Sequence, residues 1–149
     1  MDNDEFADLF SKLTNFKKNQ FHPLVWITGT PTIGENVYIG GMSEIAAKNS
    51  NIIIGDNCDI ASFVSINCGD SHKRCIGLST EVKYDPIVLE KNVFVGSHSV
   101  IKAGAHIGHH SVIAAGTIVD GIKIPPYSLV SGNPMKVKNG YYKEANDST

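Results

Sequence analysis

The chain has 149 residues, 42% of them hydrophobic, which fits one domain with a narrow apolar core. Its 13 basic and 15 acidic residues give a net charge of −2 and are spread along the chain, which excludes the basic surface of a nucleic-acid-binding protein and a polybasic membrane anchor. No apolar run is long enough to cross a membrane, and the acidic start at Asp2, Asp4 and Glu5 is unlike a signal peptide. We therefore expect a cytoplasmic protein whose partner is a small molecule.

A short amphipathic helix is expected at residues 3–19. Its apolar residues recur at helical spacing, at Phe6, Leu9, Phe10, Leu13 and Phe16, and Asn3 is available as a cap. We interpret residues 1–21 as a helical cap that covers the open end of the repeats that follow.

An aliphatic residue returns at every sixth position through most of the remaining chain. The series comprises Ile27, Ile33, Ile39 and Ile45, then Ile54, Ile60 and Ile66, then Leu89, Val95, Ile101, Ile107, Ile113 and Val119. An α-helix repeats near 3.6 residues and a half-buried strand at 2, so a period of six indicates flat faces that each point one aliphatic side chain inward. Small side chains such as Cys58, Ser99 and Ala105 follow four positions later, which suits a tight corner. The pattern predicts an all-β solenoid, a parallel β-helix with about 18 residues per three-sided coil and four to five coils.

The breaks in the hexad pattern divide the chain. The phase slips by three residues at 48–50, which we interpret as a small bulge at a corner. Residues 67–88 are polar and cannot follow the coil, and an excursion of that length is usually a functional loop. The β-helix domain is therefore expected at 22–137, with this loop inside it and a C-terminal tail at 138–149. Cys58, Cys68 and Cys75 lack metal-ligand spacing and are expected to be buried free thiols.

Three motifs occur in the second half of the chain: N-V-F-V-G-S-H at 92–98, A-A-G-T at 114–117, and I-P-P followed by G-N-P within 124–134. They resemble the hexapeptide acetyltransferases of the galactoside and maltose type, and many sugar acetyltransferases of polysaccharide assembly share them. The resemblance covers roughly residues 50–140. It implies a left-handed β-helix that forms a homotrimer and binds acetyl-CoA in grooves between neighbouring subunits. The left hand rests on the resemblance alone, because the usual rule for parallel strand connections favours the opposite hand.

The resemblance also implies a histidine base. Transfer of an acetyl group from a thioester to a hydroxyl or amine needs a base for the acceptor's proton and donors for the oxyanion. In the family the base sits where the chain leaves the coil for its long loop, and Asp70-Ser71-His72 occupies that position here. The galactoside-type enzymes have Gly-His-Pro there, so assigning His72 as the base needs a shift of one position. Three interpretations of Asp70 are open: it orients the imidazole, binds substrate, or is a solvated loop carboxylate without a role. The candidate substrate-binding residues are Asn67, Lys73 and Arg74.

The acetyl-CoA site is likewise implied by the family. Ser97 and His98 lie in the turn that the family sets beside the thiol end of CoA, and Phe94 falls where related enzymes put an aromatic ring over the thioester. The backbone of Ala114, Ala115 and Gly116 matches the strip along which pantetheine runs, and Lys136 is positioned to meet a CoA phosphate. Each has a plainer alternative: Phe94 suits a subunit interface, residues 114–116 suit close coil stacking, and Lys136 suits an unpaired surface site.

A histidine-rich segment suggests two other classes of protein. His106, His109 and His110 raise the possibility of a zinc enzyme similar to the γ-class carbonic anhydrases, which use this fold. His98, His106 and His109 occupy different positions of the hexad and do not align from coil to coil, so we expect no metal. A non-catalytic scaffold has no need of the long loop or of the A-A-G-T and G-N-P motifs.

The sequence thus predicts an acetyl-CoA-dependent acetyltransferase that acts on a hydroxyl or amino group of a sugar. The expected acceptor is a nucleotide-linked or lipid-linked sugar of bacterial surface-polysaccharide biosynthesis, such as O-antigen, capsule or lipopolysaccharide. An antibiotic is the nearest alternative acceptor, because related xenobiotic acetyltransferases share the coil. We expect direct attack without an acetyl-enzyme intermediate, and a homotrimer with its active sites between subunits.

Overall fold

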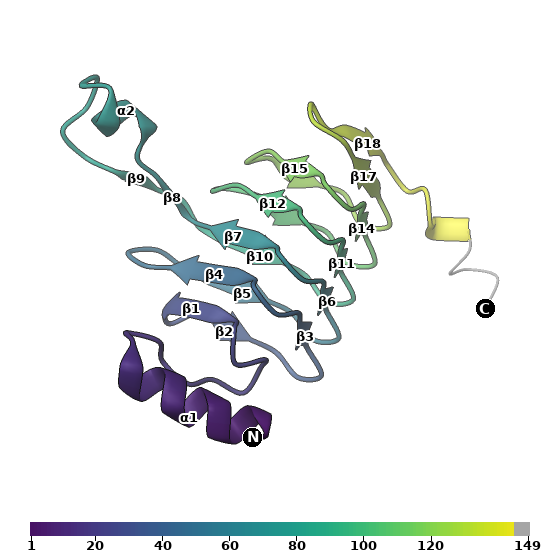
Figure 1. Cartoon of the computed structure of the whole chain (residues 1–149). Coiled ribbons are helices and arrows are strands. Elements are labelled where there is room, and N and C mark those ends of the chain that lie inside the picture. The colour runs from purple at the N-terminus through teal and green to yellow at the C-terminus, as the bar shows by residue number, and fades with distance from the viewer. Residues whose placement is uncertain (145–149) are drawn as a thin grey trace.

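Three-sided coils stacked along one axis make up most of the molecule, as the computed structural model of residues 1–144 shows (Figure 1). Along the coil, successive strands lie on the first, second and third faces in turn, except that the last two strands share the third face. The first face holds β1 (Trp26–Gly29), β4 (Glu44–Ala47), β7 (Ser65–Asn67), β12 (Val100–Ile101) and β15 (Ile118–Val119). The second face holds β2 (Thr32–Ile33), β5 (Ile52–Ile54), β10 (Ile87–Leu89), β13 (His106–Ile107) and β16 (Lys123–Ile124). The third face holds β3 (Tyr38–Ile39), β6 (Asp59–Ile60), β11 (Phe94–Val95), β14 (Val112–Ile113), β17 (Leu129–Ser131) and β18 (Lys136–Lys138).

The register between coils matches the hexad period. Paired residues on the first face are 18 apart at Trp26↔Glu44 and at Val100↔Ile118. The offset grows to 21 at Glu44↔Ser65, because residues 48–50 add a turn between the first and second faces. It is 35 at Ser65↔Val100, where the long loop is inserted, and 17 at His106↔Lys123 on the second face. The predicted parallel β-helix is confirmed, with five coils on the first face.

The core is a stack of the predicted aliphatic side chains. From Ile39 to Val119 every inward hexad residue is at most 2% exposed. Ile27 and Ile33 are only half-buried, because the first coil has a neighbouring coil on one side alone. The predicted small corner residues are confirmed too. Serines and a threonine at the corners are buried, and their hydroxyls hydrogen-bond to the backbone. The Ser43 hydroxyl donates to Ala61 O at 2.9 Å, and the Ser128 hydroxyl donates to Pro125 O at 2.6 Å.

The two ends of the stack are covered differently. Helix α1 (Asn3–Leu13) lies across the first coil, where the rings of Phe10 and Phe16 pack edge-on against Trp26 at centroid distances of 5.8 and 5.1 Å (Figure 1). Its N-cap is Asp2 and not the predicted Asn3, because Asp2 and Glu5 form a reciprocal capping box. The helix ends at Leu13, six residues before the predicted end, where Thr14 turns to extended backbone.

At the other end, β18 folds back antiparallel on β17 and closes the last coil, a hairpin that the hexad pattern did not predict. Of the tail predicted at 138–149, residues 145–149 lie outside the described part of the chain. Cys58 and Cys68 are buried, and burial raises the pKa of both thiols, but Cys75 is exposed in the long loop and corrects the prediction that all three are buried. Between residues 1 and 144 there is no helix long and apolar enough to cross a membrane.

Candidate active site

The long loop predicted at 67–88 is an ordered arm, which we define as residues 68–86. In it β8 (Gly69–Asp70) pairs antiparallel with β9 (Lys83–Tyr84), and the four-residue helix α2 (His72–Cys75) follows β8. The backbone N–H of Asp85 donates to Cys68 O at 3.0 Å and closes the base of the arm. Figure 1 shows the arm projecting beyond the end of β7, on the side away from β11 and β14.

Asp70 and His72 form a hydrogen-bonded pair in the arm. Oδ1 of Asp70 lies 2.5 Å from Nδ1 of His72 and also accepts the backbone N–H of His72 at 3.2 Å. Asp70 ends β8 and His72 begins α2, so the single turn residue Ser71 sets their spacing. The hydrogen bond to the His72 ring, helped by its backbone N–H, holds the pKa of the Asp70 carboxyl below its ordinary value. The carboxylate is therefore ionised at neutral pH.

This pair has the geometry of a general base with its orienting carboxylate. A carboxylate on Nδ1 favours the imidazole tautomer that carries its proton there, which leaves Nε2 free to accept a proton. The His72 side chain is 64% exposed, so Nε2 is accessible to a substrate. The structure thus brings the two predicted catalytic residues into contact.

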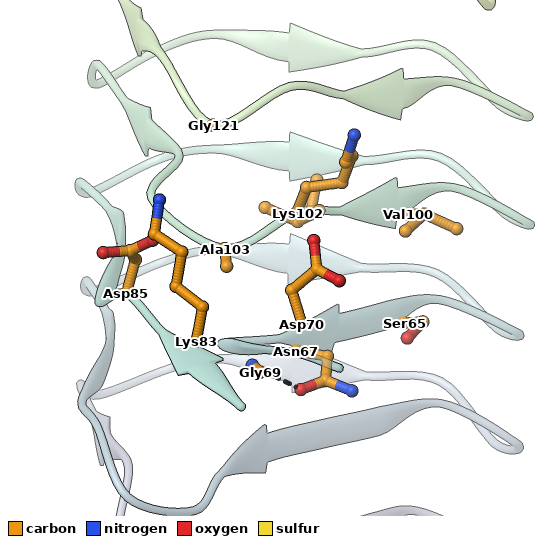
Figure 2. A pocket seen from close by; sticks show the side chains of 11 residues that line it. Ser65, Asn67, Gly69, Asp70, Lys83, Asp85, Val100, Lys102, Ala103 and Gly121 are labelled. Carbon is orange, nitrogen blue, oxygen red and sulfur yellow. Dashed lines mark hydrogen bonds and ion pairs between the residues drawn. The ribbon is translucent and has the colours of Figure 1, made fainter. Parts of the chain in front are cut away.

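A cavity of about 450 Å³ opens between one side of the arm and the later coils (Figure 2). The arm side contributes Gly69, Asp70, Lys83 and Asp85, and the coils contribute Ser65, Asn67, Val100, Ile101, Lys102, Ala103 and Gly121. Figure 2 shows the Asp70 side chain pointing from the arm toward Lys102. A cleft with this many polar groups fits a polyhydroxylated ligand.

Both lysines of this cavity are neutralised by nearby carboxylates. Nζ of Lys83 lies 3.4 Å from Oδ2 of Asp85, and Nζ of Lys102 lies 3.6 Å from Oδ1 of Asp120. A second cavity of about 320 Å³ lies within the arm, where His72 and Lys73 are among its lining residues. Asp70 and Lys83 line both cavities, so the two adjoin at the catalytic pair.

The predicted substrate-binding residues fall on two sides of the arm. Asn67 lines the larger cavity and Lys73 the smaller one, but Arg74 faces a third cavity on the opposite side, toward the first coils. The sequence analysis missed Lys102 and Asp120, although a signal was available. Both follow an inward aliphatic residue by one position, as Asn67 does, and this column stacks from coil to coil beside the arm.

The predicted acetyl-CoA residues lie elsewhere on the coil. The hydroxyl of Ser97 donates to Ser62 O at 2.8 Å, and the ring of His98 stacks on Phe63 with centroids 4.9 Å apart. His98 has a φ of +61°, so it turns the corner between the third and first faces. Phe94 is 40% exposed on the third face, and Lys136 is exposed on β18.

The strip predicted for pantetheine is open. Ala115 and Gly116 are exposed, and space remains open around Gly116, where a β-carbon would meet no atom within 4 Å. Neither this strip nor Phe94, Ser97, His98 or Lys136 lines the two cavities next to the catalytic pair. Within one chain, the structure does not bring the predicted acetyl-CoA residues and the catalytic pair together.

Three other histidines, His106, His109 and His110, form a separate cluster at the corner between the second and third faces. Nε2 of His106 lies 2.5 Å from Oε2 of Glu90, whose other oxygen accepts the backbone N–H of His109 at 3.1 Å. The ring of His110 stacks on Tyr127, and burial together with neighbouring His109 lowers the pKa of His110. Throughout residues 1–144, no group of three or more His, Cys, Asp or Glu side chains is arranged to hold a metal ion.

Comparison with known proteins finds the same parallel β-helix of hexapeptide repeats in other proteins. Residues 32–68 and 86–120 match the family model described as the hexapeptide repeat of succinyl-transferase. The chain is similar to the polySia specific acetyltransferase NeuO, with 29% identity and a TM-score of 0.65 over 74% of this chain and 52% of that chain. It is also similar to a hexapeptide-repeat-containing acetyltransferase from Vibrio cholerae O1 biovar eltor complexed with acetyl coenzyme A, with 26% identity and a TM-score of 0.69 over 92% of this chain and 76% of that one.

A third similar structure is galactoside acetyltransferase in complex with coenzyme A, with 28% identity and a TM-score of 0.59 over 81% of this chain and 66% of that chain. The chain spans about half the length of NeuO. Comparison with curated protein sequences found no significant match.

Fold and repeats together define a left-handed parallel β-helix. Residues 32–68 and 86–120 carry hexapeptide repeats, and the predicted resemblance to the hexapeptide-repeat acetyltransferases is confirmed.

Proposed function

We propose that this chain is an acetyl-CoA-dependent acetyltransferase that acetylates a hydroxyl or amino group of a sugar. The observation that carries the proposal is the Asp70–His72 pair at the junction of two polar cavities in the arm. The similarity to acetyltransferases whose structures contain acetyl-CoA or CoA supports it. A nucleotide-linked or lipid-linked sugar of surface-polysaccharide synthesis is the proposed acceptor class, as the sequence resemblance implies.

In the proposed mechanism His72 takes the acceptor's proton on Nε2 as the acceptor oxygen or nitrogen attacks the thioester carbonyl. The Asp70 carboxylate stabilises the imidazolium that forms and keeps it oriented. When the tetrahedral intermediate collapses, the C–S bond breaks, and His72 returns the proton to the thiolate that leaves. No proton or electron is left over, and His72 is regenerated.

Direct transfer is favoured because, among the described residues, no serine or cysteine side chain hydrogen-bonds to a histidine ring; the side-chain partners of the rings are Asp70, Glu90 and a neighbouring histidine. The two buried thiols, Cys58 and Cys68, have raised pKa values and are therefore poor nucleophiles. Cys75 is exposed, but it makes no hydrogen bond to a histidine in the described chain. We therefore propose that no acetyl group becomes attached to the enzyme.

We further propose that the active unit is a homotrimer. The predicted acetyl-CoA strip at residues 114–116 and the catalytic pair do not line a common cavity in one chain, so a neighbouring subunit has to supply one of the two sets. Sites of this kind form in the clefts between symmetry-related subunits. Sedimentation and kinetics under the same conditions test this, and a fully active monomer would refute it.

The central experiment is His72→Ala, assayed for thiol release from acetyl-CoA with a panel of nucleotide-linked amino sugars, simple glycosides and antibiotics. We expect kcat to fall by about 10²- to 10⁴-fold, as for loss of a general base, with acetyl-CoA affinity and melting temperature nearly unchanged because His72 lies outside the packed coil. His22→Ala, at an exposed histidine before the first coil, is the matched control. A wild-type rate for His72→Ala at every pH would exclude His72 as the base and make His98 the next residue to test.

The pH dependence of that variant distinguishes the two acceptor types. An amine that is partly deprotonated near neutral pH needs less help than a sugar hydroxyl. A fall of less than tenfold that shrinks as the pH rises therefore indicates an amino sugar, whereas a large fall at every pH favours a hydroxyl.

A further inference from the structure

The third cavity, on the side of the arm opposite Figure 2, has an unusual charge pattern. It has a volume of about 380 Å³ and lies between the arm and the first two coils. Two cations line it, Lys48 from the turn after β4 and Arg74 from α2, and no carboxylate does. The cavity beside Asp70 differs, because there each lysine is paired with an aspartate.

Both cations of the third cavity are free of ion pairs within residues 1–144. Three residues with hydroxyl groups, Thr28, Ser71 and Tyr84, also line it, and these hydroxyls make no hydrogen bond in the part of the chain that the structure describes. Free cations and free hydroxyl donors around one concavity are the groups that bind a phosphate or carboxylate oxygen.

This cavity adjoins the cavity next to the catalytic pair. Asn67 and Gly69 line both, so the two cavities are separated only by the base of the arm. The Asn67 side chain is fixed there, because its Oδ1 accepts the backbone N–H of Gly69 at 2.8 Å. A ligand with its reacting group near His72 could therefore extend past Asn67 into the third cavity.

We infer that the third cavity binds an oxyanion carried by the acceptor, with Lys48 and Arg74 as its charged ligands. The acceptor is then a sugar with a phosphate or carboxylate group, and neutral glycosides are poor substrates. This inference rests on the proposed function only in calling the ligand an acceptor. The anion site itself is inferred from the positions of Lys48, Arg74 and the hydroxyl groups around the third cavity.

Direct binding without acetyl-CoA tests the site. Glucose 1-phosphate, glucuronate and neutral glucose are titrated in turn into the full chain by calorimetry at fixed low salt, because salt screens such contacts. We expect one or both anionic sugars to bind more tightly than glucose, and Lys48→Met and Arg74→Gln each to weaken that binding about tenfold or more. Tighter binding of glucose 1-phosphate indicates a phosphorylated or nucleotide-linked acceptor, and tighter binding of glucuronate indicates an acidic sugar.

Lys123→Met is the matched control, because it removes an exposed cation on β16 without touching the arm. Equal binding of the three sugars, or anion binding that Lys48→Met and Arg74→Gln leave unchanged, would overturn the inference. In the enzyme assay the two variants should raise KM for the acceptor and leave KM for acetyl-CoA unchanged. A rise in KM for acetyl-CoA alone would assign the cavity to a CoA phosphate and also refute the inference.

Failure of the inference and failure of the proposed function are distinguishable. A protein that binds anionic sugars through Lys48 and Arg74 but releases no thiol from acetyl-CoA confirms the site and refutes the acetyltransferase. A protein that acetylates neutral and anionic sugars equally well confirms the acetyltransferase and refutes the site.

Discussion

Replacing Asp70 by asparagine removes the charge that orients His72 and keeps the size of the side chain. The Asp70 carboxylate accepts two hydrogen bonds from His72: one from the ring nitrogen Nδ1 at 2.5 Å and one from the backbone N–H at 3.2 Å. A hydrogen bond to a charged group contributes about 1.5–3 kcal/mol, and with the two side chains 42% and 64% exposed we take the lower end. Since about 1.4 kcal/mol is a tenfold change in rate, kcat should fall about tenfold in Asp70→Asn.

The assay is thiol release at saturating acetyl-CoA and acceptor, so that changes in binding do not enter kcat. Glu35→Gln, at an exposed carboxylate near the first coil, is the control for a generic loss of negative charge. In the double variant Asp70→Asn with His72→Ala, the loss should be no larger than in His72→Ala alone, because Asp70 acts through His72. Either an unchanged kcat in Asp70→Asn or a further tenfold loss in the double variant would refute this role.

Three further predictions concern the coil and its surface. Ile101→Ala should lower the free energy of unfolding by about 2–5 kcal/mol in chemical denaturation, because Ile101 is fully buried between two coils; a loss below 1 kcal/mol would contradict a close-packed stack. A thiol reagent should modify Cys75 in the native protein and leave the two buried cysteines intact until unfolding, as peptide mass mapping would show. The pKa of Glu90 is held below its ordinary value by His106, so this pair stabilises the fold above that value and the stabilisation is lost as the pH falls through the lowered pKa. Glu90→Gln should therefore flatten the acid limb of a plot of melting temperature against pH, and an unchanged limb would exclude the pair as its source.

The coil could be predicted from the sequence because each inward residue depends only on its own hexad and on the coils above and below. Ile54, Leu89 and Ile107, for example, lie far apart in sequence and stack in one column. The structures at the two ends of the coil could not be predicted from the hexad pattern. The helix stopped at Thr14 through a local cap, and the β17–β18 hairpin depends on pairing with the last coil, which has no period to reveal it.

The candidate site was only partly predictable for a related reason. Asp70 and His72 are two residues apart, so their contact follows from local backbone geometry. Lys102 and Lys48 reach the arm only through the stacking of coils, and their neighbours in sequence give no sign of it. The column of outward residues aligned coil over coil would have identified Lys102, whereas Lys48 lies outside that column, in the turn at 48–50.

All changes in coil length described above occur at one corner, between the first and second faces. Three residues are added there at 48–50, the whole arm is inserted there, and one residue is missing there before Lys123. The other two corners keep the six-residue spacing. Strand pairing on all three faces therefore continues whether the corner between the first and second faces holds extra residues, the arm or one residue fewer. An arm of different length or sequence could therefore be exchanged at positions 68 and 86 without moving the aliphatic stack. The specificity of such a protein can then evolve, or be redesigned, independently of its stability.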